Sequence, residues 1–430
     1  MKTRAGLIAL AVLVGLSFLG HRSAHAQSGP GVPAYGSPDF GFSPEGLDPT
    51  YQTPLPPEAD SSYLNPNYVD TGSRQVGPLV RTDGAFLRVE YLNWNIRKPG
   101  HELLGAPVAG VADPSLPFLV FPPGGGTPFG FAQVPTTSSI NLGNISGLQV
   151  TGGVSFIDGG SLEVSAFMLA RKSSGFRLGR AGLIPFDIDN DSGPNGDPPD
   201  EEILEGEALP LFYGTSTLLN GQVSNHVLLY DTYQAVFQSR LWEAEANYLY
   251  DLDAVGPLQF RPLIGFRYLN LTERLTQTGV FLAVPPIVTT IDAHTTNNLA
   301  GPQIGFRTSV VTEYLEVGIT PKIFVLANSM NVNVFTNHLR ANFDPIVGSS
   351  DHTTRAAFGA DVGTYVQINV TPRFSIRGGY NLLWIGNVTR PQKDVYYNDN
   401  GIAAPPGVVA RLITTDVLIT GFSVGGELRF

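Results

Sequence analysis

Apolar and polar residues alternate with a period of two over most of the chain from residue 85 onward. The pattern is clearest at 412–430, where Ser423 and Glu427 lie on the face opposite a set of large apolar side chains. That apolar set is Leu418, Phe422, Val424, Leu428 and Phe430. Successive side chains of a β-strand point to opposite faces, so the period predicts strands with one apolar and one polar face. The fold class predicted is therefore all-β.

The alternation predicts ten antiparallel strands, and twelve remain open. They are expected at 85–96, 147–157, 161–170, 225–251, 258–274, 298–310, 314–334, 355–370, 374–388 and 412–430. Short turns are expected at Asp158-Gly159-Gly160, Val311–Glu313 and Thr371-Pro372-Arg373, and long loops at 97–144, 171–222 and 389–411. This arrangement places all long loops on one side, which is typical of a transmembrane β-barrel.

Some positions depart from a regular barrel. Between 225 and 251 the apolar residues move from odd to even positions near Ser239-Arg240, which requires a bulge or a turn. A bulge keeps the strand count even and is preferred. Three prolines, Pro262, Pro302 and Pro321, each remove a ladder donor and predict further local bulges. Trp94, near the far end of the first strand, is expected at a membrane interface.

Residues 1–26 have the features of a secretory signal peptide. Lys2 and Arg4 precede an apolar run, and Ala24-His25-Ala26 supplies small residues for cleavage after Ala26. Residues 27–80 contain ten prolines and predict a disordered periplasmic linker. The chain has no cysteine, and no later apolar run is long enough for a spanning helix. An exported chain of this kind can enter a membrane as a closed barrel, expected over 84–430.

Composition and charge fit a protein of long strands and turn-rich loops and exclude some partners. Charged residues make up 15% of the chain, below the roughly 25% of soluble domains. The net charge of −11 disfavours nucleic acid as a partner. The expected partners are outer-membrane lipid and lipopolysaccharide. The closing strand resembles that of Gram-negative outer-membrane barrels, where a final aromatic such as Phe430 is part of the signal read by the barrel-assembly machinery.

Five segments, in order, resemble a planctomycete outer-membrane β-barrel family (BBP-type, family seven). They are Arg88–Trp94, Gly265–Glu273, Asn297–Gly305, Gly379–Asn381 and Asn387–Pro391. Asn93 and Asn95 depart from the more apolar residues usual in that family. The resemblance implies an outer-membrane barrel and no known transport substrate.

Charged residues recur on the face expected to line the lumen. They are Arg88, Glu90, Glu243, Glu245, Arg261, Arg267, Arg307, Glu316, Lys322, Arg355, Asp361, Arg377, Glu427 and Arg429. Such a lining either surrounds water or forms a salt-bridged filling. About eight strands leave an interior just filled by side chains, and 16–18 leave a channel. The expected function is therefore structural or that of a narrow passive pore with a mixed-charge lumen.

No catalytic, cofactor-binding or metal-binding residue is predicted. The acidic run Asp187–Glu207 has nine carboxylates and no base, which favours a solvated surface loop and leaves Ca²⁺ binding open. Residues Gly421–Gly425 match GxSxG but lack the strand–turn–helix of a nucleophile elbow. We therefore expect no enzyme and no cofactor. A barrel enzyme with a rim site and a secreted β-rich adhesin remain alternatives, and the oligomeric state is left open.

Overall fold

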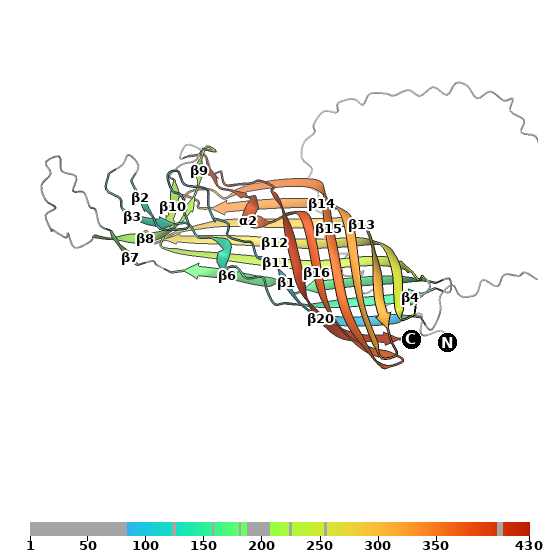
Figure 1. Cartoon of the computed structure of the whole chain (residues 1–430). Helices are drawn as coiled ribbons and strands as arrows, with labels where there is room; N and C mark the ends of the chain where they lie inside the picture. Colours follow the sequence, from blue (N-terminus) through green and yellow to red (C-terminus); the bar gives the residue numbers. More distant parts are fainter. Residues whose placement is uncertain are drawn as a thin grey trace, which may run out of the picture. The chain divides into compact units, whose positions relative to one another are not determined.

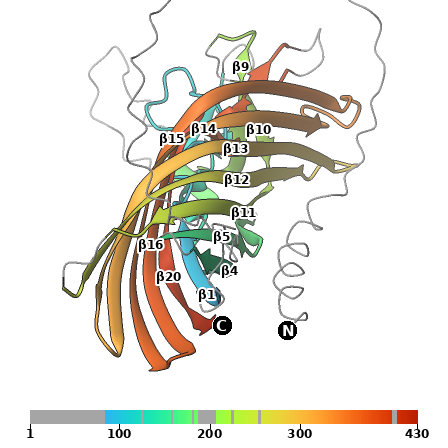
Figure 2. The same cartoon turned by 90° about the vertical axis from the view of Figure 1, so that its right-hand side faces the viewer.

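The computed structural model describes residues 84–122, 126–156, 159–179, 182–186, 207–222, 226–252, 256–401 and 407–430. Within them, ten long antiparallel strands lie side by side (Figures 1 and 2). They are β1 (Phe86–Ile96), β4 (Ile145–Ser155), β5 (Gly160–Leu169), β11 (Thr232–Tyr250), β12 (Leu258–Phe281), β13 (Ile287–Val311), β14 (Leu315–Asn337), β15 (Val347–Thr371), β16 (Phe374–Thr389) and β20 (Thr414–Arg429). Each strand pairs with its neighbours, β20 pairs with β1, and β11 pairs with both β5 and β12. The sheet therefore closes into a ten-stranded antiparallel barrel, as predicted.

The predicted closure of the last strand against the first is confirmed by residue pairing. Phe86 lies opposite Arg429 and Ile96 opposite Ile419, with no interruption between them. The short connections after β4, β11, β13 and β15 lie at the same end of the barrel as Ala85 and Phe430. The long connections lie at the other end. We call these ends the short-turn end and the long-loop end; in outer-membrane barrels the short turns are periplasmic.

The bulge predicted near Ser239-Arg240 is wrong. Strand β11 pairs with β12 in one register from Thr232 to Leu249. The extra residue lies in the strand on its other side, where β5 is continued along β11 by β6 (Lys172–Leu178) with a shift of one position. The change of apolar phase in β11 therefore has a different cause.

That cause is an inversion of the barrel's two faces part-way along the strands. On β12 the outward residues change from apolar (Ile264, Phe266) to polar (Thr272, Arg274). The buried inward residues change in the opposite sense, from charged (Arg267) to a series of leucines at 269, 271 and 275.

The same inversion occurs on β11. Near the long-loop end its inward residues are apolar, including Tyr233 and Phe237, whereas nearer the short-turn end Glu243 points inward and Trp242 outward. The backbone alternation is continuous, and only the chemistry of each face changes.

The apolar outer band has the height of a membrane core. On β12 it runs from Leu258 to Tyr268, and eleven residues at about 3.3 Å each with a tilt of about 45° cover about 25 Å. Beyond the band the strands continue as a barrel that is apolar inside and polar outside, as in a soluble protein. The secreted β-rich adhesin kept as an alternative was expected to pack its strands in two sheets, which the single closed sheet contradicts.

The strands extend further toward the long-loop end than the sequence indicated. Strand β12 continues to Phe281 and β13 begins at Ile287, whereas 275–297 was expected to lie outside the strands. Likewise β14 ends at Asn337 and β15 begins at Val347. Polar residues on the outer face of these extensions hid the strands, because no membrane contacts them there.

The long loops form small elements at their end of the barrel (Figure 1). Strands β2 (Phe118–Val120), β3 (Gly130–Gln133), β8 (Glu207–Ser216) and β10 (Val227–Tyr230) form one sheet, and β7 (Leu183–Phe186) pairs with β8. The others are η1 (Thr137–Ser139), β9 (Leu218–Leu219), α2 (Pro391–Asp394), β17 (Val395–Tyr396), β18 (Asn398–Asp399) and β19 (Val409–Ala410). The segments predicted as plain loops thus carry structure of their own.

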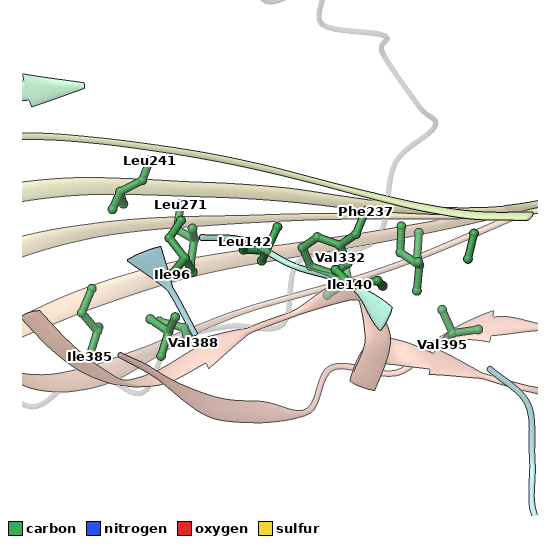
Figure 3. Packing of buried hydrophobic residues seen from close by; sticks show 14 of the residues in the cluster. Ile96, Ile140, Leu142, Phe237, Leu241, Leu271, Val332, Ile385, Val388 and Val395 are labelled. Atoms are coloured by element: carbon green, nitrogen blue, oxygen red, sulfur yellow. The ribbon is translucent and has the colours of Figure 1, made fainter. Parts of the chain in front are cut away.

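Loop side chains also fill the long-loop half of the barrel. In Figure 3, Ile140, Leu142 and Val395 pack with inward residues of the strands, including Phe237 and Leu271. We call the buried apolar loop residues of this cluster the distal plug: Leu104, Ala106, Ile140, Leu142, Val395, Tyr397 and Val408. The expectation that 97–144 is only an external loop is therefore incorrect.

The prolines do not produce the expected bulges. Pro262 lies opposite Phe306, and the register of β12 against β13 does not shift there. Between β13 and β14 the pairs that would include Pro302 and Pro321 are missing, and the pairing continues beyond each gap in the same register. Trp94 also differs from the prediction: it is buried inside the barrel, with its ring centroid 4.8 Å from that of Phe167.

The predicted signal peptide at 1–26, the linker at 27–80 and the acidic run at 187–206 lie outside the described residues. Within the described ranges, no helix is long and apolar enough to cross a membrane.

Candidate functional site

The charged residues predicted for the lumen face the interior of the short-turn half, with one exception. Arg355 on β15 is exposed to solvent. The structure adds Glu163 on β5, which the sequence placed on the polar face with Ser161 and Ser165 but not in the charged lining. Its role was missed because the partner, Arg307, is distant in sequence.

The centre of the lumen is an ion-pair network around Arg267, which is completely buried. Its guanidinium lies 3.5 Å from Glu243, 3.0 Å from Glu245 and 2.5 Å from Asp361. Lys322 lies 2.9 Å from both Glu245 and Asp361. Strand register produces the network: Glu245 lies directly opposite Arg267, and Lys322 directly opposite Asp361.

A second group of ion pairs lies nearer the short-turn end. Arg307 on β13 donates two hydrogen bonds of 2.7 Å to Glu163 across the lumen. Arg88 on β1 contacts Glu90 at 3.1 Å and Glu427 at 3.2 Å. Paired, fork-like contacts of this kind fix side-chain geometry as well as charge.

The lumen is close to electrically neutral. Among the described residues its basic side chains are Arg88, Arg261, Arg267, Arg307, Lys322, Arg377 and Arg429. Its acidic side chains are Glu90, Glu163, Glu243, Glu245, Asp251, Glu316, Asp361 and Glu427. Seven positive against eight negative charges favour a salt-bridged filling over a lining selective for one sign. Two cavities, of about 90 and 220 Å³, remain in this half.

Polar contacts of Arg390 and Asp394 hold the residues that follow β16 within the long-loop half of the barrel. Arg390 donates hydrogen bonds of 2.8 Å from Nε and Nη2 to the buried carboxylate of Glu273 and another of 3.0 Å to the carbonyl oxygen of Arg97. Asp394 accepts hydrogen bonds from the Thr389 hydroxyl and, at 2.8 Å, from the Ile413 amide. Burial raises the pKa of the Asp394 carboxyl to about 7. The lumen is therefore occupied at two levels, by charges and by the distal plug.

An acid–base pair lies on the long-loop rim, where the sequence suggested none. Nδ1 of His226 is 3.3 Å from Oδ2 of Asp399 and 3.1 Å from the Thr217 hydroxyl. The two residues are far apart in sequence, and no motif joins them. Across the described ranges, no group of three or more His, Asp or Glu residues is placed to hold a metal ion.

Ser423 of the rejected GxSxG match lies in the middle of β20 and donates a 3.1 Å hydrogen bond to Glu90. It belongs to the lumen filling. No helix follows it, because β20 runs to Arg429.

The closed ring of ten antiparallel strands, the apolar outer band and the polar lumen define the class of protein. It is a transmembrane β-barrel of the outer-membrane, porin-like type.

Comparison with known proteins narrows the class. Residues 220–430, just under half of the chain, match the family described as "Putative beta barrel porin-7 (BBP7)". The match spans β10 to β20, so the similar segment at 88–94 lies outside it. No curated protein sequence matches the chain significantly.

Solved outer-membrane proteins show weak structural similarity. The outer-membrane protease OmpT of Escherichia coli is 9% identical, with 82% of this chain and 98% of that chain covered and a TM-score of 0.41. A FadL homologue of Pseudomonas aeruginosa is 10% identical, with 80% of this chain and 90% of that chain covered and a TM-score of 0.20. The toluene transporter TodX of Pseudomonas putida is 8% identical, with 81% of this chain and 91% of that chain covered and a TM-score of 0.16. At these values no functional property of the three proteins is carried over.

Proposed function

We propose that this chain is a non-enzymatic outer-membrane barrel whose lumen is closed and whose role is structural. The observation that carries the proposal is the double occupation of the lumen. The ion-pair network around Arg267 fills the membrane-spanning half, and the distal plug fills the half beyond it. A ten-stranded barrel has little room left once such side chains point inward.

The strength of the buried ion pairs favours a permanently closed barrel. Removing one partner of a buried pair costs about 3–5 kcal/mol, because the other charge stays buried without compensation. A continuous water path through the lumen would have to separate several such pairs, including Arg267–Glu245 and Arg307–Glu163. We expect no such path to form spontaneously in most molecules.

A narrow passive pore with a mixed-charge lumen is the second candidate. The two cavities of the short-turn half favour it, because their polar linings can hold water. Conduction would also require residues 390–401 and 407–413, held by Arg390 and Asp394, to move away from the strands. The pore is then a gated one.

The proposal includes partners in the envelope. The apolar band and the strands beyond it would contact lipid and lipopolysaccharide. The assembly machinery would read the last strand, where Phe430 is exposed and its amide donates a 2.9 Å hydrogen bond to Ala85. The proposal includes membership of the BBP-type family, supported by the match of residues 220–430 and by the similar segment at 88–94 before it, and a planctomycete origin of that family. Export with cleavage after Ala26 belongs to the same proposal.

Single-channel recording of the refolded protein in a planar bilayer separates the two candidates. Insertion is verified first, by heat-modifiable migration and by resistance to alkaline extraction. A silent bilayer with inserted protein supports the structural role. Stepwise conductance of the unmodified protein would overturn it in favour of the pore.

The absence of enzymatic activity is tested at the rim, where His226 and Asp399 form an acid–base pair. Wild-type protein and His226→Ala are incubated with a mixed peptide library. We expect identical, unchanged peptide profiles. Cleavage by the wild type that the variant lacks would contradict the proposal.

A further inference from the structure

The larger cavity lies at the short-turn end of the lumen and has a volume of about 220 Å³. Five arginines line it, namely Arg88, Arg261, Arg307, Arg377 and Arg429, against three glutamates, namely Glu163, Glu316 and Glu427. Two more carboxylates contact these arginines from beside the cavity: Glu90 pairs with Arg88 and Arg377, and Asp251 pairs with Arg261. The charges around the cavity therefore balance, and its binding capacity depends on how well each arginine is paired.

Arg377 is the arginine with the weakest compensation. Its ion pair with Glu90 is long, 3.9 Å, and its hydrogen bond goes to the uncharged amide oxygen of Gln367 at 3.3 Å. The guanidinium also stacks over the Tyr365 ring, 3.5 Å from the ring centroid. Such stacking leaves the edges of the planar group directed away from the ring and able to donate hydrogen bonds.

Arg88 and Arg307 line the same cavity as Arg377. Arg307 uses its two terminal nitrogens on Glu163 and leaves its buried Nε without an acceptor. A buried donor without an acceptor is costly, so a ligand oxygen that accepts from it is favoured.

The dimensions fit a small ligand. At roughly 30 Å³ per water the cavity holds about seven waters, the space of a small oxyanion with part of its hydration. Arginine forks match the paired oxygens of carboxylate and phosphate groups. The cavity is lined at its end by Gly84, Ser155 and Arg429, so entry would be from the short-turn side.

We propose that this cavity is a binding site for a small oxyanion, either phosphate or a small carboxylate, with Arg377 as its principal ligand. Because the distal plug closes the other end, the site is a dead-end pocket that binds its ligand without passing it on. The dead-end character rests on the proposed closed lumen, whereas the binding of the anion does not.

Isothermal titration of the full-length protein in detergent, at low ionic strength, tests the site. Inorganic phosphate and acetate are titrated separately, with sodium chloride of matched ionic strength as the blank. We expect saturable binding of at least one oxyanion and at least tenfold weaker binding by Arg377→Gln. Phosphate binding without acetate binding would assign the site to phosphate, and the reverse to a carboxylate.

The matched control is Arg274→Gln, which removes an exposed arginine on the outer face of β12 and should bind like the wild type. If Arg377→Gln does not fold, the wild type still decides: the bound anion should raise its melting temperature more than matched chloride does. Equal affinity of Arg377→Gln and wild type would overturn the proposal. So would folded wild-type protein that shows neither binding heat nor anion-specific stabilisation.

Discussion

The ion pair between Arg390 and Glu273 is a buried polar contact that holds the residues following β16 inside the barrel. Both side chains are almost completely buried, and two hydrogen bonds of 2.8 Å join them. Replacing Arg390 by methionine leaves the Glu273 carboxylate buried without its partner. We expect a local destabilisation of about 3–5 kcal/mol, which is the usual cost of breaking a buried pair.

The assay is hydrogen–deuterium exchange of the backbone amides that follow β16, read by mass spectrometry. Local opening that becomes easier by about 3–5 kcal/mol raises the open population by about a hundredfold to four-thousandfold, because each 1.4 kcal/mol is a factor of ten. The amides of 391–401 and 407–413 should therefore exchange much faster in Arg390→Met. Planar-bilayer recording of the same variant then shows whether an opened plug permits conduction.

Two comparisons make the test sharp. The double variant Arg390→Met/Glu273→Leu should recover most of the protection, since removing both charges eliminates the uncompensated carboxylate. Arg274→Gln is the control variant, because it also breaks one arginine–carboxylate ion pair and lies next to Glu273 on β12. Its ion pair with Asp292 is half-exposed and contributes only about 0–1 kcal/mol to stability. If Arg390→Met exchanges like the wild type, or if the double variant is as unprotected as the single one, the reasoning is refuted.

Three further predictions concern the envelope, pH and the outer band. Deleting Phe430 should reduce the heat-modifiable protein in the outer-membrane fraction, and normal insertion would contradict the role given to the last strand. The pKa of Asp394 is raised by burial from 3.8 to about 7, so the folded plug holds this proton more tightly than the unfolded chain. The free energy of unfolding should therefore fall as the pH rises from about 4 to about 7, by at most about 4 kcal/mol. Asp394→Asn should show a flatter profile of melting temperature against pH. An unchanged slope would argue against titration of Asp394 as the cause. On the outer face of β12, Ile264→Lys within the apolar band should cost about 2–4 kcal/mol in urea titrations of lipid-embedded protein, whereas Thr278→Lys beyond the band should cost almost nothing; equal costs would mean that the membrane boundary is misplaced.

The strands followed from the sequence because side-chain alternation is local, and the even number required of a barrel favoured ten of them over eleven. The apolar Phe422 and the polar Ser423, for example, show which face of their strand is which without information from any other strand. The positions of the short turns followed in the same way. Departures arose where the same alternation continued but the surroundings changed, as at Ser239-Arg240, where an inversion of the faces resembled a bulge. Pro302 and Pro321 gave the same false indication, since skipped ladder pairs leave no mark in the sequence.

The candidate site was predictable only as a set of charges. The inward position of Arg88, Arg267 and Lys322 follows from strand parity, but their partners depend on register and on which strands meet across the lumen. Arg307 with Glu163 and Arg390 with Glu273 join residues more than a hundred positions apart. No local pattern specifies such pairs.

By itself, therefore, the sequence determined three things. The chain forms an all-β barrel, each strand has a lipid-facing and a lumen-facing side within the membrane, and charged residues line the lumen. The tertiary structure alone decided that the barrel continues beyond the membrane with its faces inverted, and that loop residues such as Ile140 and Val395 fill it there. The physical reason is that alternation reports only two different environments on a strand's two sides. Which environment is lipid, water or packed protein depends on the strand's height in the membrane and on distant segments that fold back into the barrel.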